Sequence, residues 1–235
     1  MKRLIRPFDF VLDGNSGWRV LNHKDTAIED GHVQLKPLEN LDPPLAEPHG
    51  SFGGWTLPRG VAIWDDDVFA IDPAGDRIFR WKPCCGPATP LATIGREGSG
   101  PRQLDGARGL TISHREDLVV ADTGNLRLLL FTLPGLALRR IVGPLDSRGV
   151  CAGKPDPQGG PWQPADVAAG PDGTLYVADA SGSIWKLDWQ CRPVACYRGR
   201  LPEGTVPRRV LVDAEHRCYV VVEGYDAVFA AGGDG

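Results

Sequence analysis

Three aspartates stand where a carboxylate could do chemistry. Asp72, Asp122 and Asp179 each end a short apolar run, and arginines follow the first two after five residues, at Arg77 and Arg127. A carboxylate beside a guanidinium can transfer protons or hold a polar substrate. The same aspartate recurs in three copies, however, whereas one active site would need it once. We therefore interpret these five residues as structural braces, in which the carboxylate accepts N–H groups of the tight turn that follows it.

Other catalytic signatures do not occur in the sequence. The five histidines form neither an HxH nor an HExxH pattern, and His114 and His216 fall in equivalent hairpin turns, where exposure to solvent is expected. A Gly-x-Ser-x-Gly elbow is missing, and the glycine-rich residues 95–106 lack the Lys-Ser/Thr ending of a phosphate-binding loop. We therefore expect no catalytic residue, no metal site and no cofactor.

The six cysteines include no CxxC pair, and no export signal precedes them. Reduced, half-buried thiols are the expectation for such a chain. Cys191 and Cys196 flank a short segment that could form a hairpin. They are the pair that we expect to join if the compartment is oxidising.

Two connections between the recurring units could present binding residues. Residues 95–106 are glycine-rich, and residues 143–164 form the largest insertion, of a length that is often functional. The candidate binding residues in these connections are Arg96, Arg102, Arg148, Lys154 and Trp162. An exposed aromatic residue near arginine can anchor an interface. For Trp162, packing over the next unit is the favoured alternative interpretation.

Short recurring strands must position these residues. The stretch LVVADTGNLRLLLF (residues 118–131) has degraded copies at residues 68–81 and 175–187. Each unit has an apolar run, a polar turn, a second run that ends in the aspartate, and two further runs, as antiparallel strands do. Four antiparallel strands per repeat form the blade of a β-propeller. First strands are expected at residues 58–63, 107–112, 164–169 and 207–212.

A family resemblance supports this interpretation. GREGSGPRQLDGARGLTI followed by LVVADTGNLRLLLF resembles the NHL repeat, with its glycine-rich lead, Pro-x-Gly-Val element, Val-Ala-Asp and Asn-x-Arg-Ile. Residues 95–143 match the pattern well, and residues 205–231 match it weakly because Val222 stands where aspartate is expected. The resemblance implies a propeller, commonly with six blades in that family.

The expected fold is thus all-β, a propeller of about five four-stranded blades or an incomplete six-bladed ring. The propeller would occupy residues 51–235, and residues 1–50 would supply strands that close the ring and leave no unpaired edge. The approximate repeats are 53–95, 96–143, 144–197 and 198–235.

Composition limits the partners that we expect. The net charge is -4, so no general basic field favours nucleic acid. No apolar run reaches the length of a signal peptide or of a membrane-spanning helix. These features predict a soluble bacterial protein of the cytoplasm that does not insert into membranes.

Three functional hypotheses follow. The first is a non-catalytic scaffold whose loops bind protein partners. A looser similarity to NHL-bearing proteins of phage-tail-like contractile injection systems suggests tail or baseplate subunits as those partners. The second is a metal-dependent lyase or lactonase of the NHL type. The third is RNA binding, because arginines cluster in the middle third of the chain, although nucleic acid is an unlikely partner for an acidic protein.

Overall fold

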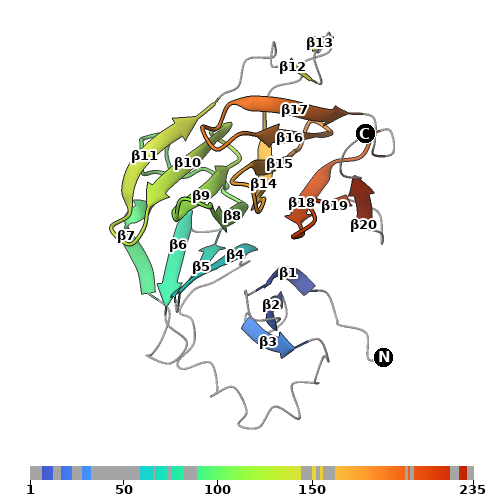
Figure 1. Ribbon diagram of the computed structural model, residues 1–235. Coiled ribbons are helices and arrows are strands. Elements are labelled where there is room, and N and C mark those ends of the chain that lie inside the picture. Colours follow the sequence, from blue (N-terminus) through green and yellow to red (C-terminus); the bar gives the residue numbers. More distant parts are fainter. Residues whose placement is uncertain are drawn as a thin grey trace.

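The computed structural model is built of strands and turns, with no helix among the residues that it describes (Figure 1). It describes residues 7–12, 17–22, 28–32, 59–65, 67–72, 76–81, 89–143, 150–151, 154–155, 162–198, 201, 204–222 and 228–231. Side chains are described within residues 60–71, 76–80, 94–143, 162–197, 201 and 204–222, with the exception of residue 66.

Three four-stranded antiparallel sheets form the centre of the molecule. The first contains β4 (Arg59–Trp64), β5 (Asp67–Asp72), β6 (Arg77–Trp81) and β7 (Thr89–Gly95). The second contains β8 (Gly109–Ile112), β9 (Asp117–Asp122), β10 (Arg127–Thr132) and β11 (Ala137–Val142). The third contains β14 (Pro164–Ala169), β15 (Leu175–Asp179), β16 (Ser183–Leu187) and β17 (Pro193–Arg198).

Along the sequence, smaller sheets come before, between and after these three. A three-stranded sheet contains β1 (Pro7–Leu12), β2 (Gly17–Asn22) and β3 (Ile28–His32). Another contains β18 (Pro207–Val212), β19 (Cys218–Val222) and β20 (Val228–Ala231). A two-stranded hairpin of β12 (Val150–Cys151) and β13 (Lys154–Pro155) lies in the longest connection.

The apolar patterns explain why these segments form blades. β9 is buried along its whole length, and β10 is buried at every residue except its last, because both strands have a neighbouring strand on each side and a neighbouring sheet on each face. β11, at the edge of the same sheet, is mostly exposed. Apolar clusters fill the spaces between successive sheets. The predicted β-propeller of four-stranded antiparallel blades is confirmed.

Apart from the β12–β13 hairpin, the sheets stand around a common centre, with the first strand of each sheet innermost (Figure 1). Two glycines allow these inner strands to approach closely. A Cβ atom on Gly60 would lie 2.8 Å from the carbonyl oxygen of Arg108, and one on Gly109 would lie 2.6 Å from the Cα of Asp166. A side chain at either position would push neighbouring blades apart.

Each blade has two ends, a corner end and a turn end. The corner end is where second strands pass into third strands, between Asp72 and Arg77, Asp122 and Arg127, and Asp179 and Ser183. The turn end is the opposite end and contains the hairpin turns at residues 113–116, 170–174, 188–192 and 213–217.

Among the described residues, the strands near the two ends of the sequence form separate sheets. β1, β2 and β3 pair only with one another, and β1 lies beside β4 (Figure 1). The last sheet is made of β18, β19 and β20 alone. The reason is local pairing: β1 and β2, and likewise β2 and β3, are joined by short connections, so each strand finds its neighbour in sequence. Within the described residues, no helix is long and apolar enough to cross a membrane.

Candidate functional site

The corner of β9 and β10 brings Asp122 and Arg127 together. Nε of Arg127 lies 2.8 Å from Oδ2 of Asp122, and the two side chains are 9% and 0% exposed. Asp122 also accepts hydrogen bonds from the backbone N–H of Asp105 and from the side chain of Asn125, at 2.8 and 2.9 Å. The carboxylate is thus surrounded by donors of its own corner and is out of reach of a substrate.

Arg127 also holds the glycine-rich connection. Its terminal nitrogens donate to the carbonyl oxygens of Ser99, Gly100 and Gln103 at 2.9, 2.7 and 3.0 Å. At the other end of the connection, the N–H of Gly106 donates to Asp76 at 2.8 Å. The connection therefore crosses from one blade corner to the next, and the candidate binding residues Arg96 and Arg102 lie exposed on it.

The corner of β15 and β16 uses a different donor. Ser183 faces Asp179 in the position that Arg127 occupies opposite Asp122. Asp179 instead accepts a hydrogen bond from the indole Nε1 of Trp185 at 2.9 Å, and from the backbone N–H of Ser181 at 2.9 Å. Trp185 is two residues further along the strand and so lies on the same face of the sheet as Ser183, a signal that the sequence contained.

The structure describes only some of the side chains of the remaining brace and binding candidates. Asp72 and Arg77 face each other in the register of β5 and β6, but the side chain of Asp72 lies outside the described residues. Arg148 and the side chain of Lys154 also lie outside them. Trp162 is 1% exposed and packs edge-to-face on Trp185, with ring centroids 5.7 Å apart. Of the two interpretations of Trp162, the structure thus shows packing over the next blade and not an exposed contact residue.

The described cysteines are free thiols. Cys191, Cys196 and Cys218 are all buried and unpaired by disulfides. Burial raises the pKa of Cys218 to about 12 and also raises the pKa of Cys191, although Arg140 acts in the opposite direction on the latter. A thiol with such a pKa carries little thiolate at neutral pH, so none of these features marks a nucleophile.

An ion pair crosses the interior between inner strands. Oδ1 of Asp166 on β14 lies 3.4 Å from Nη1 of Arg209 on β18, and Oδ2 accepts the backbone N–H of Val210 at 3.0 Å. These two residues occupy the repeat position that Gly60 and Gly109 fill in the preceding blades. Asp166 and Arg209 were not identified as a pair from the sequence. The signal was present, because one repeat position holds glycine in two blades, aspartate in the third and arginine in the fourth.

Groups that can transfer protons lie close together at the turn end. Nδ1 of His216 lies 3.8 Å from Oδ2 of Asp172, and each side chain is about 40% exposed. Oδ1 of Asp172 is already used by Thr174, whose hydroxyl and backbone N–H donate to it at 2.5 and 3.1 Å. The two residues come from turns of neighbouring blades, which is why their positions in the sequence could not reveal the pair.

Charges around the pair favour an ionised carboxylate. Burial alone would raise the pKa of Asp172, but the hydrogen bonds from Thr174, together with His216 and Lys186, hold that pKa below its usual value. A Cβ atom on Gly173 would lie 3.6 Å from the Cβ atoms of both His114 and Trp189. The β8–β9 turn therefore lies beside the turn that carries Asp172. The pair is therefore the candidate functional site, at a junction of three blades.

A metal ion is not an evident part of this site. Among the side chains that the structure describes, no three of His, Cys, Asp and Glu gather closely enough to hold one. Within the pair, Thr174 occupies one oxygen of Asp172, which leaves one carboxylate oxygen and the imidazole of His216 as ligands. This set is too small for the three protein ligands of a catalytic zinc site.

Comparisons with known proteins agree with the fold. Residues 157–187 match the family model described as strictosidine synthase-like, N-terminal. No curated protein matches the sequence. Virginiamycin B lyase from Staphylococcus aureus has 13% identity and a TM-score of 0.57, with 94% of this chain and 64% of that chain covered. Glutaminyl cyclase from Myxococcus xanthus has 13% identity and a TM-score of 0.54, with 92% and 85% covered.

A protein assigned as a gluconolactonase has 18% identity and a TM-score of 0.54, with 77% of this chain and 61% of that chain covered. This chain spans about 60% of the length of the lyase structures that it matches. At these identities the similarity establishes the fold. The blades, the NHL-like repeat and these relatives together define an NHL-like β-propeller.

The comparisons correct the first functional hypothesis. The solved structures that share this fold include lyases and a glutaminyl cyclase, so the hypothesis of a non-catalytic scaffold is wrong as the leading interpretation. Neither the matched family nor these solved structures support a link to a phage tail or a contractile injection system. The enzymatic alternative now has the better support.

Proposed function

We propose that this chain is an enzyme of the lyase or lactonase type, with His216 as its proton-transfer group and Asp172 as the residue that positions it. The observation that carries the proposal is the His216–Asp172 pair, which two blades assemble at the turn end of a fold shared with enzymes. One of the similar lyase structures is a catalytically inactive histidine-to-alanine variant with quinupristin. A histidine is thus essential in that relative.

The chemistry of the two reaction types has one requirement in common. A lyase needs a base that takes a proton from the substrate so that a leaving group can depart, and a lactonase needs a base that takes a proton from the attacking water. Histidine serves both because its ordinary pKa lies near neutrality. A carboxylate at Nδ1 orients the ring and stabilises the imidazolium that forms, which leaves Nε2 for the substrate.

The arrangement around Asp172 supports this assignment. Thr174 fixes Oδ1, so the carboxylate presents Oδ2 to His216 in one orientation. Preorganisation of this kind is what a positioning residue contributes to catalysis. His114, on the adjoining turn, is a second exposed imidazole close to the same place. No step is assigned to a metal ion, because the described residues do not form a metal site.

The test uses the whole chain and substrates that the relatives suggest, namely quinupristin and gluconolactone. We expect turnover of one of them, and a decrease in kcat/KM of about 100-fold or more in His216→Ala. Asp172→Asn should decrease kcat more than it raises KM, because it disturbs the orientation of His216. Glu215→Gln, an exposed position in the same turn, is the matched control. Turnover that is unchanged in His216→Ala would contradict the assignment, and no turnover of either substrate would contradict the proposed reaction types.

A further inference from the structure

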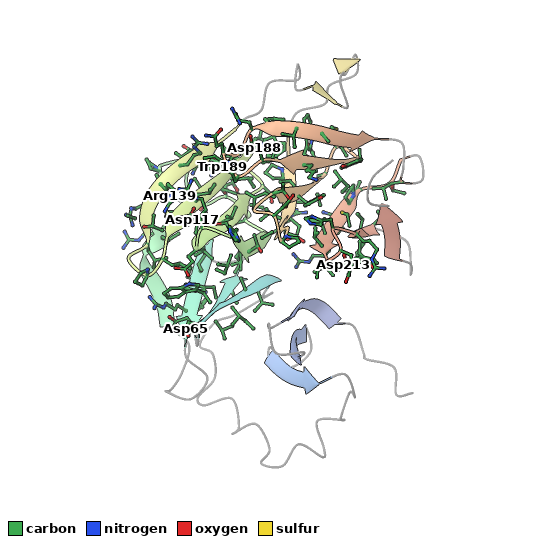
Figure 2. All side chains as sticks on the ribbon, viewed as in Figure 1. Asp65, Asp117, Arg139, Asp188, Trp189 and Asp213 are labelled. Atoms are coloured by element: carbon green, nitrogen blue, oxygen red, sulfur yellow. The ribbon has the colours of Figure 1, made fainter. Side chains whose placement is uncertain are left out.

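A pocket of about 320 Å³ opens between two blades. One wall comes from β10, β11 and the β8–β9 turn, and the other from the turn that joins β16 to β17. Figure 2 shows Asp117, Arg139 and Trp189 gathered at this junction, while Asp213 lies on another blade. The pocket is lined by Arg115, Asp117, Leu130, Arg139, Arg140, Trp189, Gln190 and Cys191.

Positive charge exceeds negative charge in this lining. Arg115, Arg139 and Arg140 face a single carboxylate, that of Asp117, which is 2% exposed. Nε of Arg139 lies 3.0 Å from Oδ1 of Asp117. A guanidinium has two further nitrogens, so this contact does not exhaust the donors of Arg139. Three guanidinium groups around one carboxylate repel one another, and an added anion would offset that repulsion.

The other two arginines each contact the turn that forms the opposite wall. Arg140 donates to the backbone carbonyl of Gln190 and so ties β11 to the turn of the neighbouring blade. The guanidinium of Arg115 lies over the ring of Trp189, 5.1 Å from its centroid. Trp189 is 53% exposed, although a large aromatic side chain usually buries more of its surface. A flat aromatic face and a cluster of guanidinium groups thus border the same cavity.

From these features we infer that the pocket binds a small anion joined to a planar ring. Arginine pairs with carboxylate and phosphate through two parallel hydrogen bonds, and the face of an indole stacks on planar rings. The volume lies at the lower end of the range of small-molecule sites. The pocket shares no lining residue with the proposed catalytic pair, although Trp189 also lies beside Gly173, the neighbour of Asp172 in the sequence.

The anionic group could be a carboxylate or a phosphate, and two probe pairs distinguish them. Naphthalene-2-carboxylate is compared with its neutral carboxamide, and adenosine monophosphate is compared with adenosine, by calorimetry on the whole chain. We expect one anion to bind at least about tenfold more tightly than its neutral counterpart. Failure of both anions to bind at about 10 mM, or equal binding of each anion and its neutral counterpart, would overturn the inference.

Variants locate the binding. Arg115→Gln and Trp189→Ala remove exposed groups of the pocket and should each weaken the anion at least about fivefold. Arg192→Gln removes one positive charge from the same turn, outside the lining, and should change affinity by less than about twofold. An equal loss in Arg115→Gln and Arg192→Gln would show a general charge effect and would contradict the site. Because the readout is binding, its result is independent of the turnover of wild-type protein and His216→Ala.

Discussion

Aspartates at the two ends of the blades differ in burial and in their hydrogen-bond partners. At the corner end, Asp122 and Asp179 are buried and receive several donors from their own corner and its connection. At the turn end, Asp172 and Asp213 are partly exposed and make contacts within one turn or with the next. Recurrence of a residue type therefore says little about function until its surroundings are known.

This difference indicates where a reaction can occur on this fold. A carboxylate with all its acceptor sites filled by buried donors stabilises the chain but cannot meet a substrate. A carboxylate that keeps one oxygen for a half-exposed imidazole can support proton transfer. The corner end thus holds the blades together, and the groups that we propose to be reactive lie at the turn end.

The largest effect is expected at the first corner. Asp122→Ala leaves Arg127 buried without its carboxylate, and breaking a buried ion pair on one side costs about 3 to 5 kcal/mol of unfolding free energy. Urea unfolding measures the loss. Asp105→Ala is the control, because the contact of Asp105 to this corner is made by its backbone N–H. A loss below about 1 kcal/mol in Asp122→Ala would refute the role of the pair as a brace.

A smaller effect is expected at the second corner. Trp185→Phe keeps most of the aromatic volume but removes the donor to Oδ2 of Asp179, which should lower the unfolding free energy by about 1 to 3 kcal/mol. Trp189→Phe, at an exposed position, should change it by less than about 0.5 kcal/mol. Similar values for the two variants would show that the indole of Trp185 does not replace the missing arginine.

The smallest effect is expected at the turn end and depends on pH. Burial would raise the pKa of Asp213, but hydrogen bonds from Arg217 and Tyr219 lower it. A carboxyl group whose pKa is lowered by folding stabilises the protein above its unfolded pKa, and that contribution disappears as pH falls through the folded value. The contribution should thus be lost below about pH 4.

Urea midpoints measured between neutral pH and about pH 3 check this expectation. Asp213→Asn should show a weaker decrease on acidification than the wild type, and Glu116→Gln, in the equivalent turn of another blade, should follow the wild type. If Asp213→Asn lost stability on acidification as steeply as the wild type, Asp213 would not be a source of the pH dependence.

Much of the fold could be predicted because strands and turns are local. Runs such as SIWKL and PADVAA coincide with β16 and β14, since alternation, flanking turn residues and the repeat all point to the same boundaries. The N-terminal sheet could not be placed in this way. Its strands pair with one another, but its place beside β4 depends on contacts between segments that are distant in the sequence.

The candidate site could be predicted from the sequence to a lesser degree than the fold. His114 and His216 were recognised as equivalent turn residues, but the approach of His216 to Asp172 depends on how two blades sit beside each other. The pocket around Trp189 has the same origin, because its arginines and its indole come from different blades. Residues of this kind have no fixed spacing in the sequence.

The amino-acid sequence alone thus determined the repeat, the strands of each blade and the aspartate at each corner, because hydrogen bonding and apolar alternation act over a few residues. Only the tertiary structure decided which donor each aspartate meets, that Trp162 is buried, and which groups converge at the turn end. These outcomes depend on packing between blades, where a shift of about one residue in register would bring different side chains together.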